Sequence, residues 1–507
     1  MFKGIIVLNL GGDIANDYSK LIRKQNVFAR VLFAGSATID TIKEANPQGI
    51  VICGNVSRKE EYSLDKQIFA LGVPILGVAD GMLAMVSTFG GTIEPSNTKA
   101  HSEEISVKSS VLLKGLPDKI KVFNDPAGKA ADLPEGFVSV ANSESLQNSV
   151  IENKDKNFFG CSFQISSGES KHFDKILSNF LFDVCNCQKD WNVENFINSS
   201  VKEIKNIIGN GSVLLGLSGG VDSAVAAALL YKAIGSRLHC VFVDHGFMRK
   251  GESELVKQIF TEFFPVSLTC VDARQRFMDK LIGVDDPEKK RKIIGAEFLE
   301  VFKEESKKIG KLDYFAQGTI YPDIIESGAA GAGKLVKSHH NVGGLPKELG
   351  FTSLIEPLKY LYKHEVRKVG SALGLPNEFV LRQPFPGPGI AVRCLGALTK
   401  ERVNLVRESD AILREEVKKA NLQQFADQYF TVLPGIKSVG VKNGQRVLFE
   451  AIAIRAVKTV DFMTADWVCY PEELLRTVSN RILNEVPGVN RVLLDISPKP
   501  PASIEWE

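Results

Sequence analysis

The sequence LSGGVDS at residues 217–223 constrains the fold of this 507-residue chain more than any other feature. It follows the apolar run at residues 213–217 and precedes a helix-compatible run at residues 224–230. Glycines let the backbone approach an anion closely, Ser218 and Ser223 offer hydroxyl groups, and the start of the next helix presents unpaired N–H groups. This order of strand, loop and helix predicts an α/β domain with a phosphate site in the loop.

The loop lacks the lysine and the spacing of a Walker phosphate loop. It resembles the PP-loop of N-type ATP pyrophosphatases, which split ATP between its α and β phosphates. A second apolar run ends at Asp244, where the edge of an open α/β sheet binds ligands, so we expect the adenosine there. The loop residues expected to bind ATP together with Asp244 are Ser218, Gly219, Gly220, Val221, Asp222, Ser223 and Ala224.

The loop alone fits several families, including NAD synthetases, argininosuccinate synthetases and tRNA-thiolating enzymes. Further motifs narrow the choice, because together they resemble the GMP synthetases in order and without a large gap from about Phe196 to Glu507. They are DPEKKRKIIG (286–295), QGTIYPDIIES (317–327), KSHHNVGGLP (337–346), PFPGPG (384–389), MTADW (463–467) and KPPASIEWE (499–507).

The resemblance to the GMP synthetases implies an adenylation followed by an amination. The xanthine O2 of XMP attacks the α-phosphorus of ATP, Mg²⁺ and loop N–H groups stabilise the departing pyrophosphate, and ammonia then displaces AMP from purine C2. Asp222, Ser218 and Ser223 are the expected catalytic residues, with Asp222 orienting the Mg²⁺. The XMP phosphate and the pyrophosphate require cations. The residues expected at the XMP site are Arg291, Lys337, Lys499 and Glu505.

The chain before this region has the alternating apolar runs of parallel strands joined by helices, such as residues 4–8 and 49–52. It resembles a class I glutamine amidotransferase domain. The predicted fold class is therefore α/β with three domains. They are a class I glutamine amidotransferase-like domain (1–190), a PP-loop ATP pyrophosphatase domain with a Rossmann-like parallel sheet (191–385) and a small α+β dimerisation domain (386–507).

The amidotransferase-like domain lacks the residues that hydrolyse glutamine. Active members of that class carry a cysteine nucleophile in a G-x-C-x-G turn, and here residues 77–81 read GVADG, with Ala79 at the nucleophile position. The family's F-H-P-E run reads FQIS at residues 163–166, which places Gln164 and Ser166 where histidine and glutamate stand. A methyl group cannot form a thioester, so glutaminase activity is predicted to be absent.

Several other positions of the amidotransferase site have drifted as well, which argues for a natural loss. Leu83 replaces the glutamine after the turn, residues 54–56 replace a G-G-P segment, and residues 125–128 replace an S-H-G-D segment. Cys53 and Cys161 lie near the relevant strands, but neither has a histidine at the motif position. Free ammonia is thus the expected nitrogen donor.

Composition excludes some function classes. Lys+Arg 62 against Asp+Glu 60 gives a net charge of +2, so neither nucleic acid nor a membrane surface is an expected partner. The eight scattered cysteines and the absence of a signal-like start predict a reduced, cytoplasmic protein, and the resemblance implies a homodimer.

Two alternatives remain at this stage: a non-catalytic nucleotide-binding regulatory protein, and an ATP pyrophosphatase for another purine. The amidotransferase-like domain itself could cover apolar surface, regulate through a retained pocket, or dock a separate ammonia source.

Overall fold

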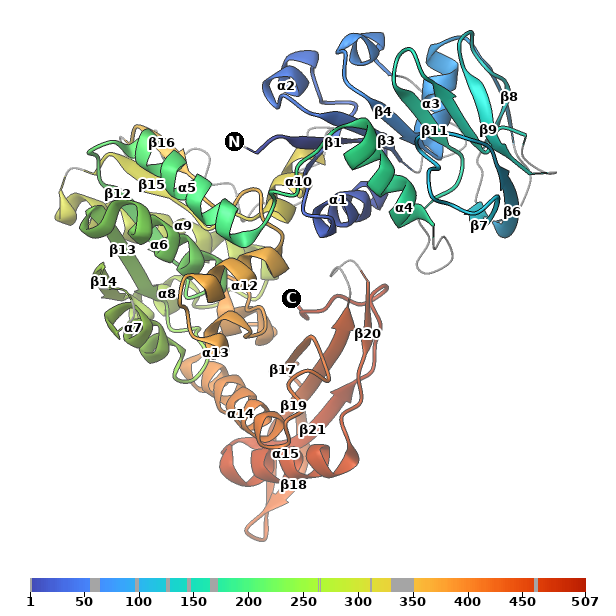
Figure 1. The fold of residues 1–507 in the computed structure, drawn as a ribbon. Helices are drawn as coiled ribbons and strands as arrows, with labels where there is room; N and C mark the ends of the chain where they lie inside the picture. Colours follow the sequence, from blue (N-terminus) through green and yellow to red (C-terminus); the bar gives the residue numbers. More distant parts are fainter. Residues whose placement is uncertain are drawn as a thin grey trace. The chain divides into compact units, whose positions relative to one another are not determined.

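The structure is a computed structural model that describes residues 2–54, 64–95, 100–124, 128–143, 147–164, 172–262, 264, 266–310, 312–329, 351–459 and 464–507. The chain forms two compact units (Figure 1). The first contains the residues up to Ser199 and the segment that begins at Pro322, and the second contains most of the chain from Ser200 to Glu507. The predicted domain boundaries at 190/191 and 385/386 stay predictions.

The first unit is built on a nine-stranded sheet. The strands from β2 to β11 run parallel to one another, and those from β11 to β7 pair antiparallel. The central parallel strands are buried, as their continuous apolar runs predict. In spatial order the strands are β2 (Phe28–Phe33), β1 (Gly4–Asn9), β3 (Gly49–Cys53), β4 (Ile75–Val78), β11 (Phe158–Cys161), β10 (Val150–Asn153), β9 (Val138–Asn142), β6 (His101–Val107) and β7 (Lys119–Asn124).

Helices connect the strands of this sheet, and a separate two-stranded ribbon pairs β5 (Thr92–Pro95) with β8 (Gly128–Asp132). α3 packs against β3, β4 and β11, at the heart of the parallel part of the sheet. The helical segments are α1 (Ile14–Lys24), α2 (Ile39–Glu44), the 3₁₀ turn η1 (Lys66–Ala70), α3 (Asp80–Thr88), α4 (Phe173–Ser178) and the π-helical η2 (Asn179–Val184). α5 (Val193–Ile208) leads from the first unit into the second.

The second unit opens with a five-stranded sheet in which every pair is parallel. Its strand order is β14 (Ser267–Asp272), β13 (Leu238–Asp244), β12 (Val213–Leu217), β15 (Tyr314–Ala316) and β16 (Ser353–Ile355). Its helices are α6 (Val221–Ile234), the 3₁₀ turn η3 (Gly235–Arg237), α7 (Glu252–Glu262), α8 (Arg274–Lys280), α9 (Pro287–Ile309), α12 (Lys363–Ala372) and α13 (Asn377–Val380). α10 (Tyr321–Ala329) lies, apart from Tyr321, in the segment that belongs to the first unit. The predicted parallel α/β architecture is confirmed.

The rest of the second unit is the predicted α+β region. β17 (Gln428–Val432), β18 (Lys437–Lys442), β20 (Ala465–Trp467) and β21 (Val489–Asp495) all pair with the long strand β19 (Gln445–Thr459). α14 (Lys400–Lys419) packs against β17 and against α15 (Glu472–Glu485), and the 3₁₀ turn η5 (Gly389–Arg393) precedes them. One apolar core runs from Leu214 of the parallel sheet to Val489 of β21, so the two sheets of this unit share a hydrophobic interior.

Within the part of the chain that the structure describes, no helix combines the length and the apolar character that crossing a membrane requires. The predicted cytoplasmic location stays a prediction.

Candidate functional sites: the phosphate loop, the 496–507 tail and the elbow

The phosphate loop joins β12 to α6 at the carboxyl edge of the parallel sheet. Gly219 has φ +76°, and a Cβ there would lie 2.8 Å from Cε of Met248, so this position favours glycine both for its conformation and for space. The Gly220 N–H donates to Oγ of Ser218 at 3.2 Å, and Oγ of Ser223 donates to the Gly220 carbonyl at 3.1 Å. The two hydroxyl oxygens are 3.2 Å apart. The loop backbone and the two serine hydroxyls therefore lie together at the N-terminus of α6, a 14-residue helix. The unpaired N–H groups at such a helix start favour binding of an anion.

Val221, Asp222, Ser223 and Ala224 form the first turn of α6. A neighbouring motif presses closely on this turn, because a Cβ on Gly318 would lie 2.8 Å from the backbone nitrogen of Ser223. Gly318 belongs to the QGTIYPDIIES motif and follows β15, the strand next to β12. Two of the motifs recognised in the sequence therefore meet at one edge of the sheet.

Asp222 is held by a lysine that the sequence analysis did not single out. Lys363 begins α12, and its Nζ lies 2.7 Å from both carboxylate oxygens of Asp222. Each side chain is 28% exposed, which leaves the pair accessible to a ligand. The described residues contain no group of three or more His, Cys, Asp or Glu side chains that could hold a metal by themselves. Mg²⁺ commonly uses one or two carboxylates together with substrate phosphates, so Asp222 fits a Mg²⁺ that arrives with ATP.

Asp244 lies at the end of β13, next to the strand that leads into the phosphate loop. Its Oδ1 accepts the Gly246 N–H at 3.0 Å, and its Oδ2 accepts the hydroxyl of Ser253 at 3.0 Å. The carboxylate is therefore oriented by its own loop and by α7. This is the position expected for the adenosine, and that role stays a prediction.

The PFPGPG motif is fixed by buried cations that also escaped the sequence analysis. The guanidinium carbons of Arg249 and Arg393 lie 4.3 and 5.2 Å from the ring centroid of Phe385. Both arginines have a nitrogen 3.8 Å from a carboxylate oxygen of Asp410. Burial lowers the pKa of Arg249 to about 10, and Asp410 opposes that shift. The guanidinium of Arg382, two residues before the motif, pairs with Glu252 at 3.0 Å.

Glu505 and Arg291, two of the residues expected at the XMP site, lie at one corner of the second unit. Oε1 and Oε2 of Glu505 accept hydrogen bonds from Nη2 and Nε of Arg393 at 2.8 and 3.0 Å. Burial disfavours the charged guanidinium of Arg393, but Glu505 together with Asp410 and Glu252 outweighs it, and the pKa of Arg393 is raised. Arg291 donates to the main-chain oxygen of Glu507, two residues beyond Glu505.

Lys499 belongs to the C-terminal tail formed by residues 496–507. Its backbone exchanges two hydrogen bonds with that of Ala465, at 2.7 and 3.0 Å. Lys337, the fourth residue expected at the XMP site, lies outside the described residues. The structure thus brings Arg291 and Glu505 into one neighbourhood and places Lys499 on the same tail, while the binding roles of all four residues stay predictions.

In the first unit, the turn between β4 and α3 has the geometry of a nucleophile elbow. Ala79 has φ +50° and ψ −115°, a left-handed conformation that is strained for a residue with a side chain. A Cβ on Gly77 would lie 2.7 Å from the Gly81 carbonyl oxygen, and a Cβ on Gly81 would lie 1.9 Å from that of Ile52. The tight turn therefore keeps its two glycines, but its apex carries only a methyl group.

The strand beside the elbow leads to Gln164, the second position that the sequence analysis singled out. β11 pairs in parallel with β4, and the Ala79 N–H donates to the Cys161 carbonyl at 2.7 Å. Gln164 follows three residues after Cys161, at the same edge of the sheet. Ser166, residues 55 and 56, and residues 125–127 lie outside the described residues, whereas Leu83 is buried in α3.

The two cysteines near the elbow are not reactive thiols. Cys53 and Cys161 are each at most 1% exposed. Burial raises the pKa of Cys161 to about 12 and that of Cys53 further still, so both remain protonated near neutral pH. Neither is therefore suited to replace the missing nucleophile.

Comparison with known proteins covers almost the whole chain. The family model described as glutamine amidotransferase class-I matches residues 13–184, that of NAD synthase matches residues 191–269, and that of the GMP synthase C terminal domain matches residues 415–506. The protein of Acetivibrio thermocellus named GMP synthase [glutamine-hydrolyzing] is 46% identical over 509 residues, which cover 99% of each chain. Proteins of the same name from Bacillus cytotoxicus and Bacillus anthracis are each 47% identical over 508 residues, again with 99% of each chain covered. With this identity over its full length, the chain belongs to the GMP synthase family.

Proposed function

We propose that this chain makes GMP from XMP, ATP and free ammonia, releasing AMP and pyrophosphate, and that it does not hydrolyse glutamine. Membership of the GMP synthase family and the intact phosphate loop support the first half of the proposal. The second half rests on the residues of this chain, because its relatives carry the name glutamine-hydrolyzing.

The second unit supplies what the ATP half of the reaction requires. The N-terminus of α6 and the hydroxyls of Ser218 and Ser223 offer hydrogen bonds and a favourable dipole to the phosphates. Lys363 places a cation beside the loop, where negative charge develops as pyrophosphate departs. Asp222 would hold a Mg²⁺ that neutralises charge on the phosphates.

One observation carries the loss of the glutaminase: the apex of the elbow is an alanine. The backbone there adopts the strained conformation that exposes a nucleophile, but a methyl group cannot attack an amide carbon. The predicted base position holds Gln164, whose amide cannot exchange a proton near neutral pH. Glutamine therefore has neither a nucleophile nor a base at this site.

The test measures GMP formation from XMP and Mg·ATP with a single nitrogen source, either ammonium chloride or glutamine freed of ammonia. We expect product with ammonium and background with glutamine. The Ala79→Cys variant is the matched control, and it should also fail with glutamine because it still lacks a base. Equal product from glutamine in the parent chain would refute the loss of glutaminase. No product from either source would favour a regulatory nucleotide-binding protein or another purine substrate.

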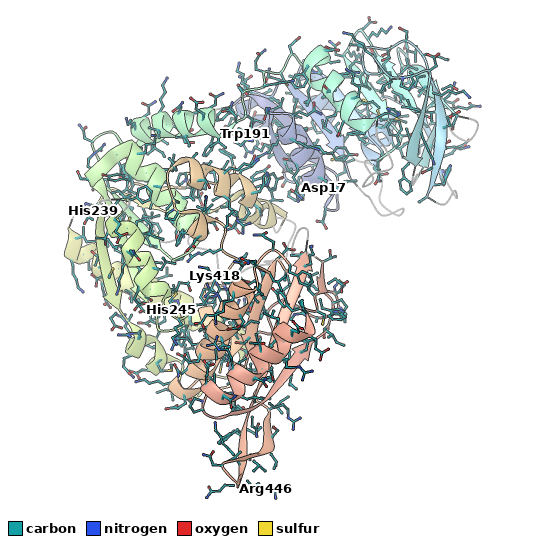
Figure 2. The ribbon with its side chains drawn as sticks, turned by 60° about the horizontal axis from the view of Figure 1, so that its bottom comes forward. Asp17, Trp191, His239, His245, Lys418 and Arg446 are labelled. Atoms are coloured by element: carbon teal, nitrogen blue, oxygen red, sulfur yellow. The ribbon has the colours of Figure 1, made fainter. Side chains whose placement is uncertain are left out.

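We also propose that the chain is a homodimer that associates through the β18–β19 hairpin. This hairpin extends away from the body of the second unit, with Arg446 at its tip (Figure 2). Val439, Val441 and Leu448 are 50, 76 and 60% exposed along it, although their apolar side chains favour burial. Sedimentation of the chain and of a Val441→Asp/Leu448→Asp variant would test this, since the variant should be monomeric. A monomeric parent chain would contradict the proposal.

A further inference from the structure

Lys290 is a fully buried lysine whose every donor is used. It lies near the start of α9, next to Arg291, and its side chain is 0% exposed. Its Nζ donates to the carbonyls of Cys394 and Ala391 at 2.9 and 3.5 Å and to Oε2 of Glu507 at 2.6 Å. An ammonium group has three donors, so this arrangement satisfies it completely. Removing one partner of such a buried pair leaves the other charge uncompensated, which is strongly unfavourable.

Glu507 is equally well satisfied at the other end of this ion pair. Its side chain is 5% exposed, and its second carboxylate oxygen accepts the Gly396 N–H at 3.1 Å. Its main-chain oxygen accepts a hydrogen bond from Arg291. The two residues are 217 positions apart in the chain, so the pair joins α9 to the tail formed by residues 496–507.

This ion pair has a neighbour in the chain, on each side, that the sequence analysis expects at the XMP site. Arg291 follows Lys290 directly on α9, and Glu505 precedes Glu507 by two residues on the tail. Glu505 is bound by Arg393, which adjoins Cys394, one of the acceptors of Lys290. The Lys290–Glu507 contact therefore joins α9, which carries Arg291, to the tail that carries Glu505.

We propose that Lys290 and Glu507 are positioning residues for XMP and form a latch that holds the 496–507 tail against α9. The proposal rests on the proposed GMP synthase function. Neither residue needs to touch the nucleotide. The latch sets the distance between Arg291 and the Glu505–Arg393 pair, and so it governs XMP binding while leaving the ATP loop unchanged.

Other contacts hold the earlier part of the tail, so breaking the latch should not unfold the unit. Nη1 and Nη2 of Arg455 donate to the carbonyls of Ser497 and Ser503 at 2.5 and 3.1 Å. The indole nitrogen of Trp506 donates to Asp495 at 2.8 Å. These anchors attach the tail to the C-terminal sheet, whereas the Lys290–Glu507 pair and the Arg291 hydrogen bond to the main-chain oxygen of Glu507 attach its end to α9.

The experiment compares Glu507→Gln and Lys290→Met with the parent chain in ammonium-dependent GMP formation. Lys289→Met is the matched control, because Lys289 is the exposed neighbour of Lys290 on the same helix and loses the same charge. We expect both latch variants to raise the KM for XMP about tenfold or more and to change the KM for ATP less than about twofold, since one partner of a buried pair is left uncompensated. The control should leave both constants unchanged.

Hydrogen exchange of peptides from the 496–507 tail provides a second readout that needs no activity. Exchange should rise in both latch variants and stay at the parent level in Lys289→Met. The combined Lys290→Met/Glu507→Leu variant replaces the pair by apolar side chains, so it should fold with parent-like stability and still show a raised KM for XMP.

The two readouts separate failure of the latch from failure of the proposed function. Unchanged tail exchange and an unchanged KM for XMP in Glu507→Gln would overturn the latch. Equal increases in the KM for XMP and ATP would also overturn it, because they would indicate a general loss of structure. If the parent chain makes no GMP while tail exchange still rises in the latch variants, the proposed function fails and the mechanical link stands.

Discussion

The elbow of the first unit and the phosphate loop of the second unit are the same kind of strand-to-helix junction, but they differ in the side chains that they present. Each joins a buried parallel strand to a helix at the carboxyl edge of a sheet, β4 to α3 and β12 to α6. Each contains a left-handed residue, Ala79 with φ +50° and Gly219 with φ +76°. The backbone of both turns is tightly bent, but the elbow has an alanine at its apex, whereas the phosphate loop has the hydroxyls of Ser218 and Ser223.

The difference shows where the chemistry of each turn resides. A phosphate loop acts largely through its backbone N–H groups and its helix N-terminus, so an intact backbone is most of the site. A nucleophile elbow acts through one side chain, and its backbone only aims that side chain. With Ala79 at its apex the turn lacks that side chain, and the proposed loss of glutaminase is compatible with an intact backbone, because the turn also joins β4 to α3 in the core of the sheet.

The largest expected effect comes from replacing Asp222, the carboxylate in the first turn of α6 after the phosphate loop. Asp222→Ala should reduce AMP formation about a thousandfold, since it removes both the proposed Mg²⁺ ligand and the partner of Lys363. Initial rates of AMP release with XMP and ammonium measure this. Asp222→Asn keeps the side-chain shape, and turnover at the parent level in that variant would rule out the metal role. Unchanged thermal unfolding should accompany the loss of rate.

A smaller effect should follow from Gly219→Ala, which puts a side chain into the left-handed position of the phosphate loop. An alanine is strained at the φ of +76° observed there, and its Cβ would also lie 2.8 Å from Cε of Met248, so the KM for ATP should rise about tenfold. Gly235→Ala is the matched control at the other end of α6, where φ is +59° and no atom lies within 4 Å of the added Cβ. It should lose about 1 kcal/mol of stability with an unchanged KM for ATP. Equal kinetics in both variants would mean that the loop geometry does not matter.

The smallest effect should come from Ala79→Gly, which relieves the backbone strain of an alanine with φ +50°. A glycine adopts the observed conformation without steric cost, so the first unit should gain about 1 kcal/mol against unfolding. Ala84→Gly, in the middle of α3, should instead lose about 1 kcal/mol. Calorimetry of the first unit's transition measures both changes. Destabilisation by Ala79→Gly would show that the alanine side chain stabilises the turn, and it would contradict the interpretation of Ala79 as a strained residue in a nucleophile-elbow backbone.

Much of the fold follows from local sequence. Continuous apolar runs such as residues 213–217 predict buried parallel strands, and glycines mark the turns where the backbone must bend or approach closely. The alanine at position 79 is also read directly from the sequence, so the absence of a cysteine there can be recognised without the structure. These features are readable because each depends on a few neighbouring residues whose spacing matches the geometry of a strand, turn or helix.

The pairs that complete the sites are decided by tertiary structure alone. Lys363 reaches Asp222 across 141 positions, Arg393 reaches Glu505 across 112, and Lys290 reaches Glu507 across 217. Charged residues are common on any surface, and nothing in their local spacing distinguishes a solvated lysine from one enclosed by carbonyls. Only the packing of distant segments brings these partners together and shields Lys290 and Arg393 from water, and so only the folded chain decides which charges become buried.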